Sequence, residues 1–327
     1  MASTGKLHTG KLRIVFGDVV LGVHGEGFDY LFSYAAGGME SLVICGREWL
    51  YRTPGSTFWR ATTDNDRGNG FSRRSAMWMG ADMFRETEKI RIFLDGKQVK
   101  KFLAPDNNRF GGEIPAKEIT VSFTYRTATK PHTRVEVSYT VKEGGRIRVD
   151  VRYRGKKGLP ELPVFGMRFI MPTVADGYVY DGLSGETYPD RMAGGVKGSY
   201  EVKGLPVTPY LVPQDCGMHM ETERLTVQRH TTLSNVCSDA DKNREPFSLT
   251  FEKHGKPFAF TCLPYTAEEL ENATHQEELP PARRTVVCIL GAVRGVGGID
   301  SWGSDVEPDW RIDAEKDIEF SFYIAAG

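Results

Sequence analysis

Strict alternation of apolar and polar residues between positions 119 and 153 constrains the fold of this chain more than any other feature. Apolar residues occupy every second position of 119–125, 135–141 and 147–153. In an extended strand, every second side chain lies on the same face of the sheet. Because short polar turns separate the three runs, they predict an antiparallel meander.

The third run indicates how this meander is buried. Its polar positions are Arg146, Arg148, Asp150, Arg152 and Arg154, which together form a charged stripe. Charged side chains are almost never fully buried without partners. One face of the meander must therefore lie in water, and the other must pack against a second sheet.

Shorter apolar or alternating runs predict strands along the rest of the chain. A hairpin turn is indicated by Asp95-Gly96, since this pair tolerates the left-handed backbone of a tight turn. The predicted strands are 12–16, 28–32, 90–93, 99–102, 165–171, 178–180, 247–251, 258–262, 286–290 and 320–324.

Helices are few. Thr266 with Glu269 three residues later is typical of a capping box, and Leu270 and Ala273 could supply the buried side of that helix. A second short helix is predicted over 72–84 with Ser72 as its N-cap. Strands dominate without alternating with helices, which predicts an all-β antiparallel sandwich with many strands in two large sheets. No low-complexity linker divides residues 1–327, so a single domain is expected.

The composition excludes several classes of protein. The chain has 327 residues, 40% of them hydrophobic, and a formal net charge of -1 from 42 basic and 43 acidic residues. Such a balance gives no field that would attract nucleic acid or an anionic membrane. No apolar run suits a signal peptide or a membrane span, so a cytoplasmic protein is expected.

The cysteines indicate neither a disulfide framework nor a zinc site. They lie far apart in the sequence, without a C-x-x-C pair or a histidine at ligand spacing. We expect all five to be small buried or half-buried apolar residues. They are Cys45, Cys216, Cys237, Cys262 and Cys288.

The stretch FWRATTDNDRGNGF, residues 58–71, carries more hydrogen-bonding groups than a turn requires. One interpretation is a well-tied loop whose carboxylates cap backbone N–H groups. The other is a loop that presents polar groups to a ligand or partner, with Gly68 and Gly70 allowing it to move. The residues by themselves favour the structural interpretation.

A second polar cluster contains Glu186, Tyr188, Asp190 and Arg191. It is typical of an Asp–Arg pair that holds a loop, and less so of a saccharide-facing acid–base pair. Two further residues, Gln214 and Asp215, are expected to anchor a loop.

Two histidines, His219 and His275, are candidates for acid–base chemistry. Neither has a partner at a telling spacing, so we interpret both as structural. G-x-S-x-G, H-E-x-x-H and phosphate-binding glycine motifs are absent, which argues against most hydrolase, zinc-protease and nucleotide-binding functions. The glycines of 295–298 lack the Lys-Ser/Thr that follows them in a phosphate loop.

Five separated motifs, in order over roughly residues 10–325, resemble the C-terminal β-sandwich of family-2 β-galactosidases. In two-chain members this sandwich is a separate small subunit. The motifs are Phe58-Trp59-Arg60-Ala61 with Thr63-Asp64-Asn65-Asp66-Arg67-Gly68; Gly182 with Glu186, Tyr188, Asp190 and Arg191; Pro209-Tyr210, Pro213-Gln214 and Gly217; Pro264-Tyr265-Thr266 with Glu269-Leu270 and His275; and Gly295-Val296-Gly297-Gly298 with Asp300-Ser301-Trp302-Gly303.

This resemblance implies a super-sandwich similar to galactose mutarotases and a role in hydrolysing terminal β-galactosides such as lactose. The family's two catalytic glutamates, about 5 Å apart in a retaining enzyme, lie on a TIM barrel. No such barrel is indicated here. The resemblance therefore implies a large partner subunit with the barrel, no catalytic residue, metal or cofactor on this chain, and the potential for higher oligomers.

For the site, the resemblance implies that Asp64, Asn65, Asp66, Arg67 and Gly68 form a loop beside the galactose pocket, with Gly68 as a hinge. Two positions depart from the family. The position of an expected sugar-stacking tryptophan is occupied by Val286, which has no aromatic face. The segment 182–188 lacks the family's proline.

An alternative is a free-standing carbohydrate-binding or mutarotase-like protein. It would need a histidine and a carboxylate together, for example His219 or His275 near Glu186 or Asp215.

Overall fold

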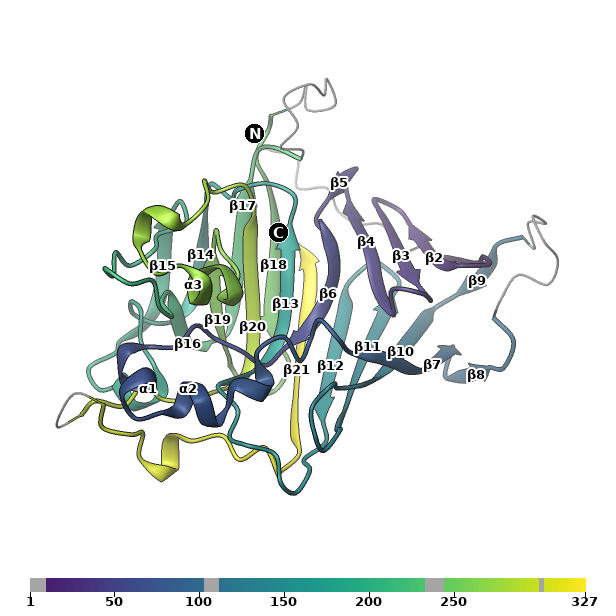
Figure 1. Cartoon of the computed structure of the whole chain (residues 1–327). Helices are drawn as coiled ribbons and strands as arrows, with labels where there is room; N and C mark the ends of the chain where they lie inside the picture. Colours follow the sequence, from purple (N-terminus) through teal and green to yellow (C-terminus); the bar gives the residue numbers. More distant parts are fainter. Residues whose placement is uncertain (1–9, 103–111, 233–243, 300–302) are drawn as a thin grey trace.

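The structure, a computed structural model, describes residues 10–102, 112–232, 244–299 and 303–327. β-Strands dominate this part of the chain, and every pair of neighbouring strands in it is antiparallel (Figure 1). The predicted all-β antiparallel fold is confirmed. None of the helices in the described ranges is both long enough and apolar enough to span a membrane.

The largest sheet of the described residues has ten strands. The predicted meander forms its centre, with Val121 opposite Tyr139 and Val137 opposite Val151. The strands, in spatial order, are β15 (Lys197–Lys203), β14 (Gly177–Leu183), β17 (Arg224–Arg229), β18 (Phe247–Lys253), β21 (Ile318–Ala326), β12 (Ile147–Tyr153), β11 (Arg134–Lys142), β10 (Glu118–Arg126), β7 (Glu86–Leu94) and β8 (Lys97–Val99).

Two smaller sheets complete the described strands. The six-stranded sheet has the order β5 (Arg47–Glu48), β4 (Gly38–Ile44), β3 (Phe28–Ser33), β2 (Val20–Gly25), β1 (Leu12–Phe16) and β9 (Ile114–Ala116). The five-stranded sheet has the order β16 (Met218–Thr222), β19 (Phe258–Leu263), β20 (Thr285–Val293), β13 (Val164–Met171) and β6 (Arg52–Thr57).

Both smaller sheets pack on the ten-stranded sheet (Figure 1). Phe169 of β13 lies against Phe251 and Phe322, with ring centroids 5.2 and 6.1 Å away. On the six-stranded side, Phe32 contacts Tyr139 at 5.5 Å. These aromatic contacts belong to one continuous hydrophobic core, which runs the length of the sandwich. The meander's inner residues are buried and its charged stripe is not, as the alternation predicts.

The prediction of two large sheets is wrong, because the layer opposite the ten-stranded sheet is divided. β6 lies beside β4 but forms its hydrogen-bonded ladder with β13. Twist accumulates across a wide sheet, and splitting the covering layer lets each part follow the curvature beneath it.

Short helices cover the outer face of the five-stranded sheet (Figure 1). The capping box of Thr266 and Glu269 is confirmed at the start of α3, and Leu270 and Ala273 are buried. The described helices are α1 (Asp64–Gly68), α2 (Phe71–Arg74) and α3 (Ala267–Asn272), with 3-10 turns η1 (Ala76–Trp78), η2 (Pro189–Arg191), η4 (Gln276–Glu278) and η5 (Pro308–Trp310).

The predicted helix over 72–84 is wrong in extent and in its cap. α2 ends at Arg74, and its N-cap is Gly70 rather than Ser72. Gly70 and Gly80 both have φ near +77°, a left-handed conformation that a helix cannot contain. A helix in this region therefore cannot extend past either glycine.

Burial of the cysteines is confirmed for Cys216 and Cys262, and Cys288 is half-buried. The expectation fails for Cys45, which is exposed in the turn between β4 and β5 with φ of 50°. Cys237 lies outside the described residues, as do Asp300, Ser301 and Trp302 of the last motif.

Candidate functional site

The stretch from Phe58 to Phe71 is not the loop that its composition suggests. Thr63 caps the single helical turn α1, its hydroxyl accepting the backbone N–H of Asp66, whose carboxylate in turn accepts the backbone N–H of Thr63 at 3.0 Å. This reciprocal capping box satisfies two backbone donors at once. It fixes α1 although five residues are too few for a stable isolated helix.

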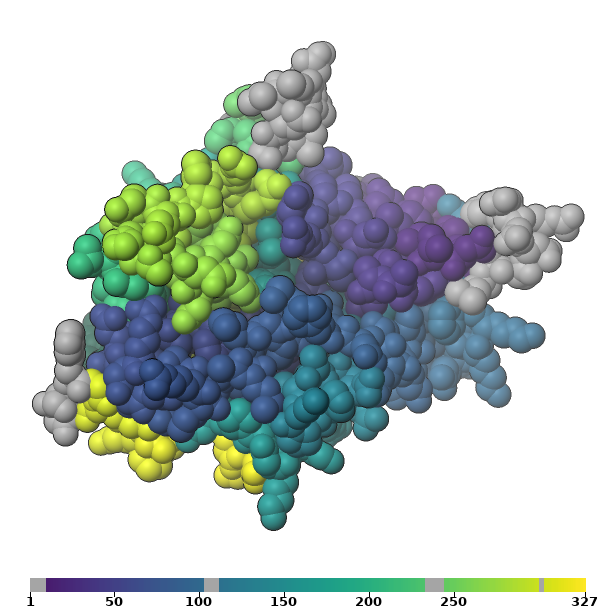
Figure 2. Space-filling model, in the orientation of Figure 1, coloured from purple at the N-terminus to yellow at the C-terminus, as the bar shows by residue number. Residues whose placement is uncertain are grey.

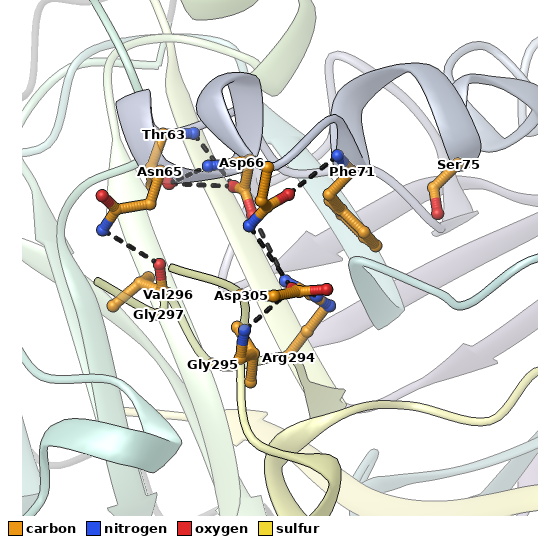
Figure 3. A network of polar contacts seen from close by, with 12 residues as sticks. Thr63, Asn65, Asp66, Phe71, Ser75, Arg294, Gly295, Val296, Gly297 and Asp305 are labelled. Atoms are coloured by element: carbon orange, nitrogen blue, oxygen red, sulfur yellow. Dashed lines mark hydrogen bonds and ion pairs between the residues drawn. The ribbon is translucent and has the colours of Figure 1, made fainter. Parts of the chain in front are cut away.

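Asp66 is the central residue of this region and is completely buried (Figure 3). One of its carboxylate oxygens lies 2.6 Å from Arg60, and the other lies 3.3 Å from Arg294. Both arginines are also buried. Burial by itself would lower the pKa of Arg60, but the carboxylates of Asp66 and Asp215 raise it, so the guanidinium stays charged.

Arg294 connects α1 to the end of β20 and to the segment that follows. Its guanidinium donates to Asp305 at 2.6 Å and lies 3.8 Å above the ring of Phe71 (Figure 3). Arg60 donates to the carbonyl oxygen of Gly295 at 3.0 Å. Two buried cations, Arg60 and Arg294, therefore hold the helical turn α1 in place.

Direct contacts also tie α1 to two neighbouring segments. The side-chain amide of Asn65 donates to the carbonyl oxygen of Val296 at 3.2 Å (Figure 3). The backbone N–H of Asp64 donates to Gln214 at 2.9 Å, and Arg67 donates to the carbonyl oxygen of Pro213 at 3.2 Å. Residues predicted from separate motifs thus meet around α1.

A pocket of about 280 Å³ opens where these segments meet. Of the residues predicted for the site, Asp64, Asn65, Tyr188, Gln214 and Asp215 line it. Its remaining lining residues, which the sequence did not single out for a site, are Thr63, Tyr210 and Val296. Carboxylates, amides and tyrosine rings around one opening suit a ligand with many hydroxyl groups.

Asp215 is the strongly perturbed acid of this pocket. Burial raises the pKa of its carboxyl to about 7, although Arg60 and a hydrogen bond from Tyr188 oppose the shift. The Tyr188 hydroxyl donates to Asp215 at 2.9 Å, and burial raises the pKa of this tyrosine well above its ordinary value. Tyr188 and Asp215 therefore form a hydrogen-bonded pair in the pocket lining, and the charge of Asp215 changes near neutral pH.

This shift predicts a pH effect on stability. The Asp215 carboxyl ionises near pH 4 in the unfolded chain but near pH 7 in the folded one. Its contribution to the free energy of unfolding therefore falls as the pH rises from 4 to 7. The test is to measure the free energy of unfolding of Asp215→Asn and of the unaltered chain by urea denaturation at pH 5 and at pH 8. We expect the variant to be more stable relative to the unaltered chain at pH 8 than at pH 5. An equal difference at both pH values would contradict this assignment.

The Asp190–Arg191 pair holds a loop. This agrees with the structural interpretation of the pair rather than with a saccharide-facing acid–base role. The Asp190 carboxylate accepts the backbone N–H groups of Val296 and Gly297 at 3.0 and 2.8 Å. Arg191 lies 3.7 Å from that carboxylate and donates to the carbonyl oxygen of Gly297. The pair positions the 295–298 segment without lining the pocket.

Other predicted residues lie away from the pocket lining. Glu186 is exposed and accepts the Thr208 hydroxyl at 2.8 Å. His219 is buried between Tyr178 and the carbonyl oxygen of Gly185, each 3.0 Å from one ring nitrogen. Burial lowers the pKa of His219 to about 4, so the ring is neutral at pH 7.

His275 stands at the surface beside η4, where it pairs with Glu278 at 3.3 Å. Among the described residues, neither His275 nor His219 is hydrogen-bonded to Glu186 or Asp215. The pairings given as examples for the alternative function are therefore not formed as hydrogen bonds, and His275 pairs with Glu278 at the surface instead. The described part of the chain also contains no group of three His, Cys, Asp or Glu residues placed to hold a metal ion.

Val286 is buried on β20 under α3. It lines a second cavity of only about 30 Å³, which also touches Trp59, Arg60 and Asp215. This space has room for one or two water molecules and is too small for a sugar ring. Val286 also lines a larger opening of about 380 Å³, together with Tyr51, Thr266 and Arg284.

Comparison with known proteins identifies the family. The family model described as beta galactosidase small chain matches residues 24–324. A β-galactosidase small subunit from Latilactobacillus sakei is 58% identical over 325 residues, which cover 99% of this chain and 100% of that protein. The chain belongs to the β-galactosidase small-chain family. This confirms the family predicted from the five motifs.

Longer relatives match as well. A β-galactosidase from Halalkalibacterium halodurans is 33% identical over 96% of this chain, but the match covers 28% of that protein. This small-chain family member therefore spans about a quarter of such a relative's length. A solved galactose mutarotase-like protein from Lactobacillus casei aligns with 94% of this chain and 100% of its own at 10% identity, with a TM-score of 0.41.

Proposed function

We propose that this chain is the non-catalytic subunit of a two-chain β-galactosidase that hydrolyses terminal β-D-galactosides such as lactose in the cytoplasm. The observation that carries the proposal is the full-length match to a small subunit, together with the match to about a quarter of a longer β-galactosidase. The remaining three quarters of that enzyme have no counterpart here. A large partner chain supplies them, including the TIM barrel and both catalytic glutamates.

In the assembled enzyme the chain contributes a wall of the galactose pocket. The polar pocket at α1 supports this role, because Asp64, Asn65 and Gln214 line it with hydrogen-bonding groups and Tyr210 lines it with a ring. Aromatic faces and convergent polar groups are what sugar recognition uses. The buried contacts of Asp66 keep α1 in place, so the pocket is formed before substrate arrives.

The chain's role is therefore positioning rather than proton or glycosyl transfer. A retaining glycosidase needs one carboxylate as nucleophile and another as acid and base, about 5 Å apart. Here Asp66 is committed to two arginines, and Asp215 is bonded to Tyr188. We propose that the partner's glutamates perform both steps, without a cofactor or metal on this chain.

Gly68 provides a specific test of the pocket wall. It ends α1 in ordinary helical geometry, and an added Cβ would lie 3.0 Å from the Cα of Gly303. Alanine is therefore compatible with the helix, but its Cβ would make a close contact that displaces the backbone at Gly303 slightly. We expect Gly68→Ala to alter kcat of the assembled enzyme at least 3-fold while the chain alone keeps its melting temperature within about 2 °C.

Unfolding of the isolated Gly68→Ala chain together with normal kinetics after assembly would show that this turn is only structural. Because Asp66 keeps α1 in place, the expected change in kcat comes from a displaced pocket wall rather than from the hinge motion that the resemblance implies for Gly68.

The assembly itself is tested by assaying the chain alone and mixed with the large β-galactosidase chain of the same organism on a chromogenic β-galactoside. We expect activity from the mixture only. Polarimetry on fresh α-galactose tests the mutarotase alternative: acceleration by the pure chain, lost in His219→Ala or His275→Ala, would replace the proposed function.

A further inference from the structure

The segment that follows α2 exposes large apolar side chains on a rigid backbone. Met77, Met79, Met83 and Phe84 are 40%, 47%, 61% and 70% exposed. We call these four residues the methionine patch. Exposed apolar residues are ordinary when scattered singly, but a contiguous group marks an interaction site.

The patch is exposed because the residues between its members are anchored. The Trp78 ring is fully buried, stacks on Phe58 at 5.4 Å and donates to the carbonyl oxygen of Pro160 at 2.9 Å. Ser75 donates to the carbonyl oxygen of Glu161 at 2.8 Å. Ala81 is buried as well. The backbone therefore has a fixed conformation that leaves these apolar side chains largely exposed, with the Met77 sulfur accepting the backbone N–H of Lys130 at 3.4 Å.

The patch lies on the same face of the molecule as α3. Asp82 is buried within the segment and pairs with Arg168, which also contacts Glu268 of α3 at 3.1 Å. In Figure 2 the dark blue segment that contains α1, α2 and residues 76–84 crosses the viewed face of the molecule next to α3. A partner seated on the patch would therefore lie close to α3 as well.

We propose that the methionine patch is the docking surface for the large β-galactosidase chain, an inference that rests on the proposed function. The longer relative supports this occupant, since its matched quarter belongs to the same polypeptide as the other three quarters. Methionine and phenylalanine, with Arg73 and Arg74 beside them, match the composition of interface cores. Flexible methionines adapt to a partner's surface.

The test is a binding measurement with purified chains. We expect Met83→Ser/Phe84→Ser to weaken the Kd for the large chain of the same organism at least 100-fold, because a few central apolar side chains dominate such interfaces. The double variant should keep its melting temperature, since both side chains are exposed. Galactosidase activity should return when the large chain is raised in excess.

A matched control is Val19→Ser/Ile114→Ser, which removes apolar side chains that are 64% and 43% exposed beside the six-stranded sheet. We expect its Kd to stay within 2-fold of the unaltered chain. If the unaltered chain binds the large chain and the Met83/Phe84 variant binds equally well, the docking surface is wrong and the proposed function stands. If the unaltered chain does not bind, the proposed function fails.

The chain alone is then examined by analytical ultracentrifugation. We expect a monomer at micromolar concentration. A dimer that the Met83/Phe84 variant abolishes would assign the patch to a second copy of this chain and overturn the large chain as its occupant.

Discussion

Asp66→Asn is expected to lower the free energy of unfolding by about 3–5 kcal/mol, the usual cost of breaking a buried ion pair. The variant removes the only charge that Arg60 and Arg294 share within the described residues, while keeping the side chain's shape. Both guanidiniums would remain buried with less compensation. It would also weaken the capping of Thr63. Urea denaturation followed by circular dichroism measures the loss.

Asp64→Asn is the matched control, because it makes the same change two residues away in the same helical turn. The Asp64 side chain is 57% exposed and pairs loosely with Arg67 at 3.4 Å. Exposed pairs of this kind contribute about 0–1 kcal/mol. Equal losses in the two variants would mean that the buried network does not hold α1.

Trp78→Ala should have an effect of similar size. The indole is fully buried against Phe58 and the edge of Tyr153. Removing a large buried aromatic side chain typically costs about 3–5 kcal/mol, from lost burial and the cavity left behind. The Pro160 carbonyl would also lose its hydrogen bond. Thermal and urea denaturation should both show the loss.

Met77→Ala is the control for Trp78→Ala, because it truncates the adjacent side chain, which is exposed rather than buried. Met77 is exposed, so its truncation should change the free energy of unfolding by less than about 0.5 kcal/mol. If Met77→Ala destabilises the isolated chain as much as Trp78→Ala, the methionine patch belongs to the core rather than to an interface.

The apolar–polar alternation was sufficient to predict the meander of β10, β11 and β12, because successive side chains of a strand point to opposite faces of the sheet. The α3 capping box was equally local. The division of the opposite layer could not be predicted in this way, since it depends on β6 pairing with β13 more than 100 residues later.

The candidate site shows the same limit. The resemblance predicted only Asp64 and its neighbours beside a sugar pocket, whereas in the structure Tyr188 and Gln214, from two other motifs, line the same pocket as Asp64. The partner Arg294, which lies 228 positions from Asp66, left no local signal. The helical turn α1 did leave one, because Thr63 and Asp66 have the spacing of a capping box. Three turn-favouring residues in succession obscured it.

The most direct test of the central claim is a titration of this chain into a fixed amount of the large β-galactosidase chain, with hydrolysis of a chromogenic β-galactoside as the readout. The proposed function predicts no activity from this chain alone and a rise that saturates at one equivalent. Hydrolysis by the isolated chain, or a large chain whose activity is unchanged throughout the titration, would contradict it.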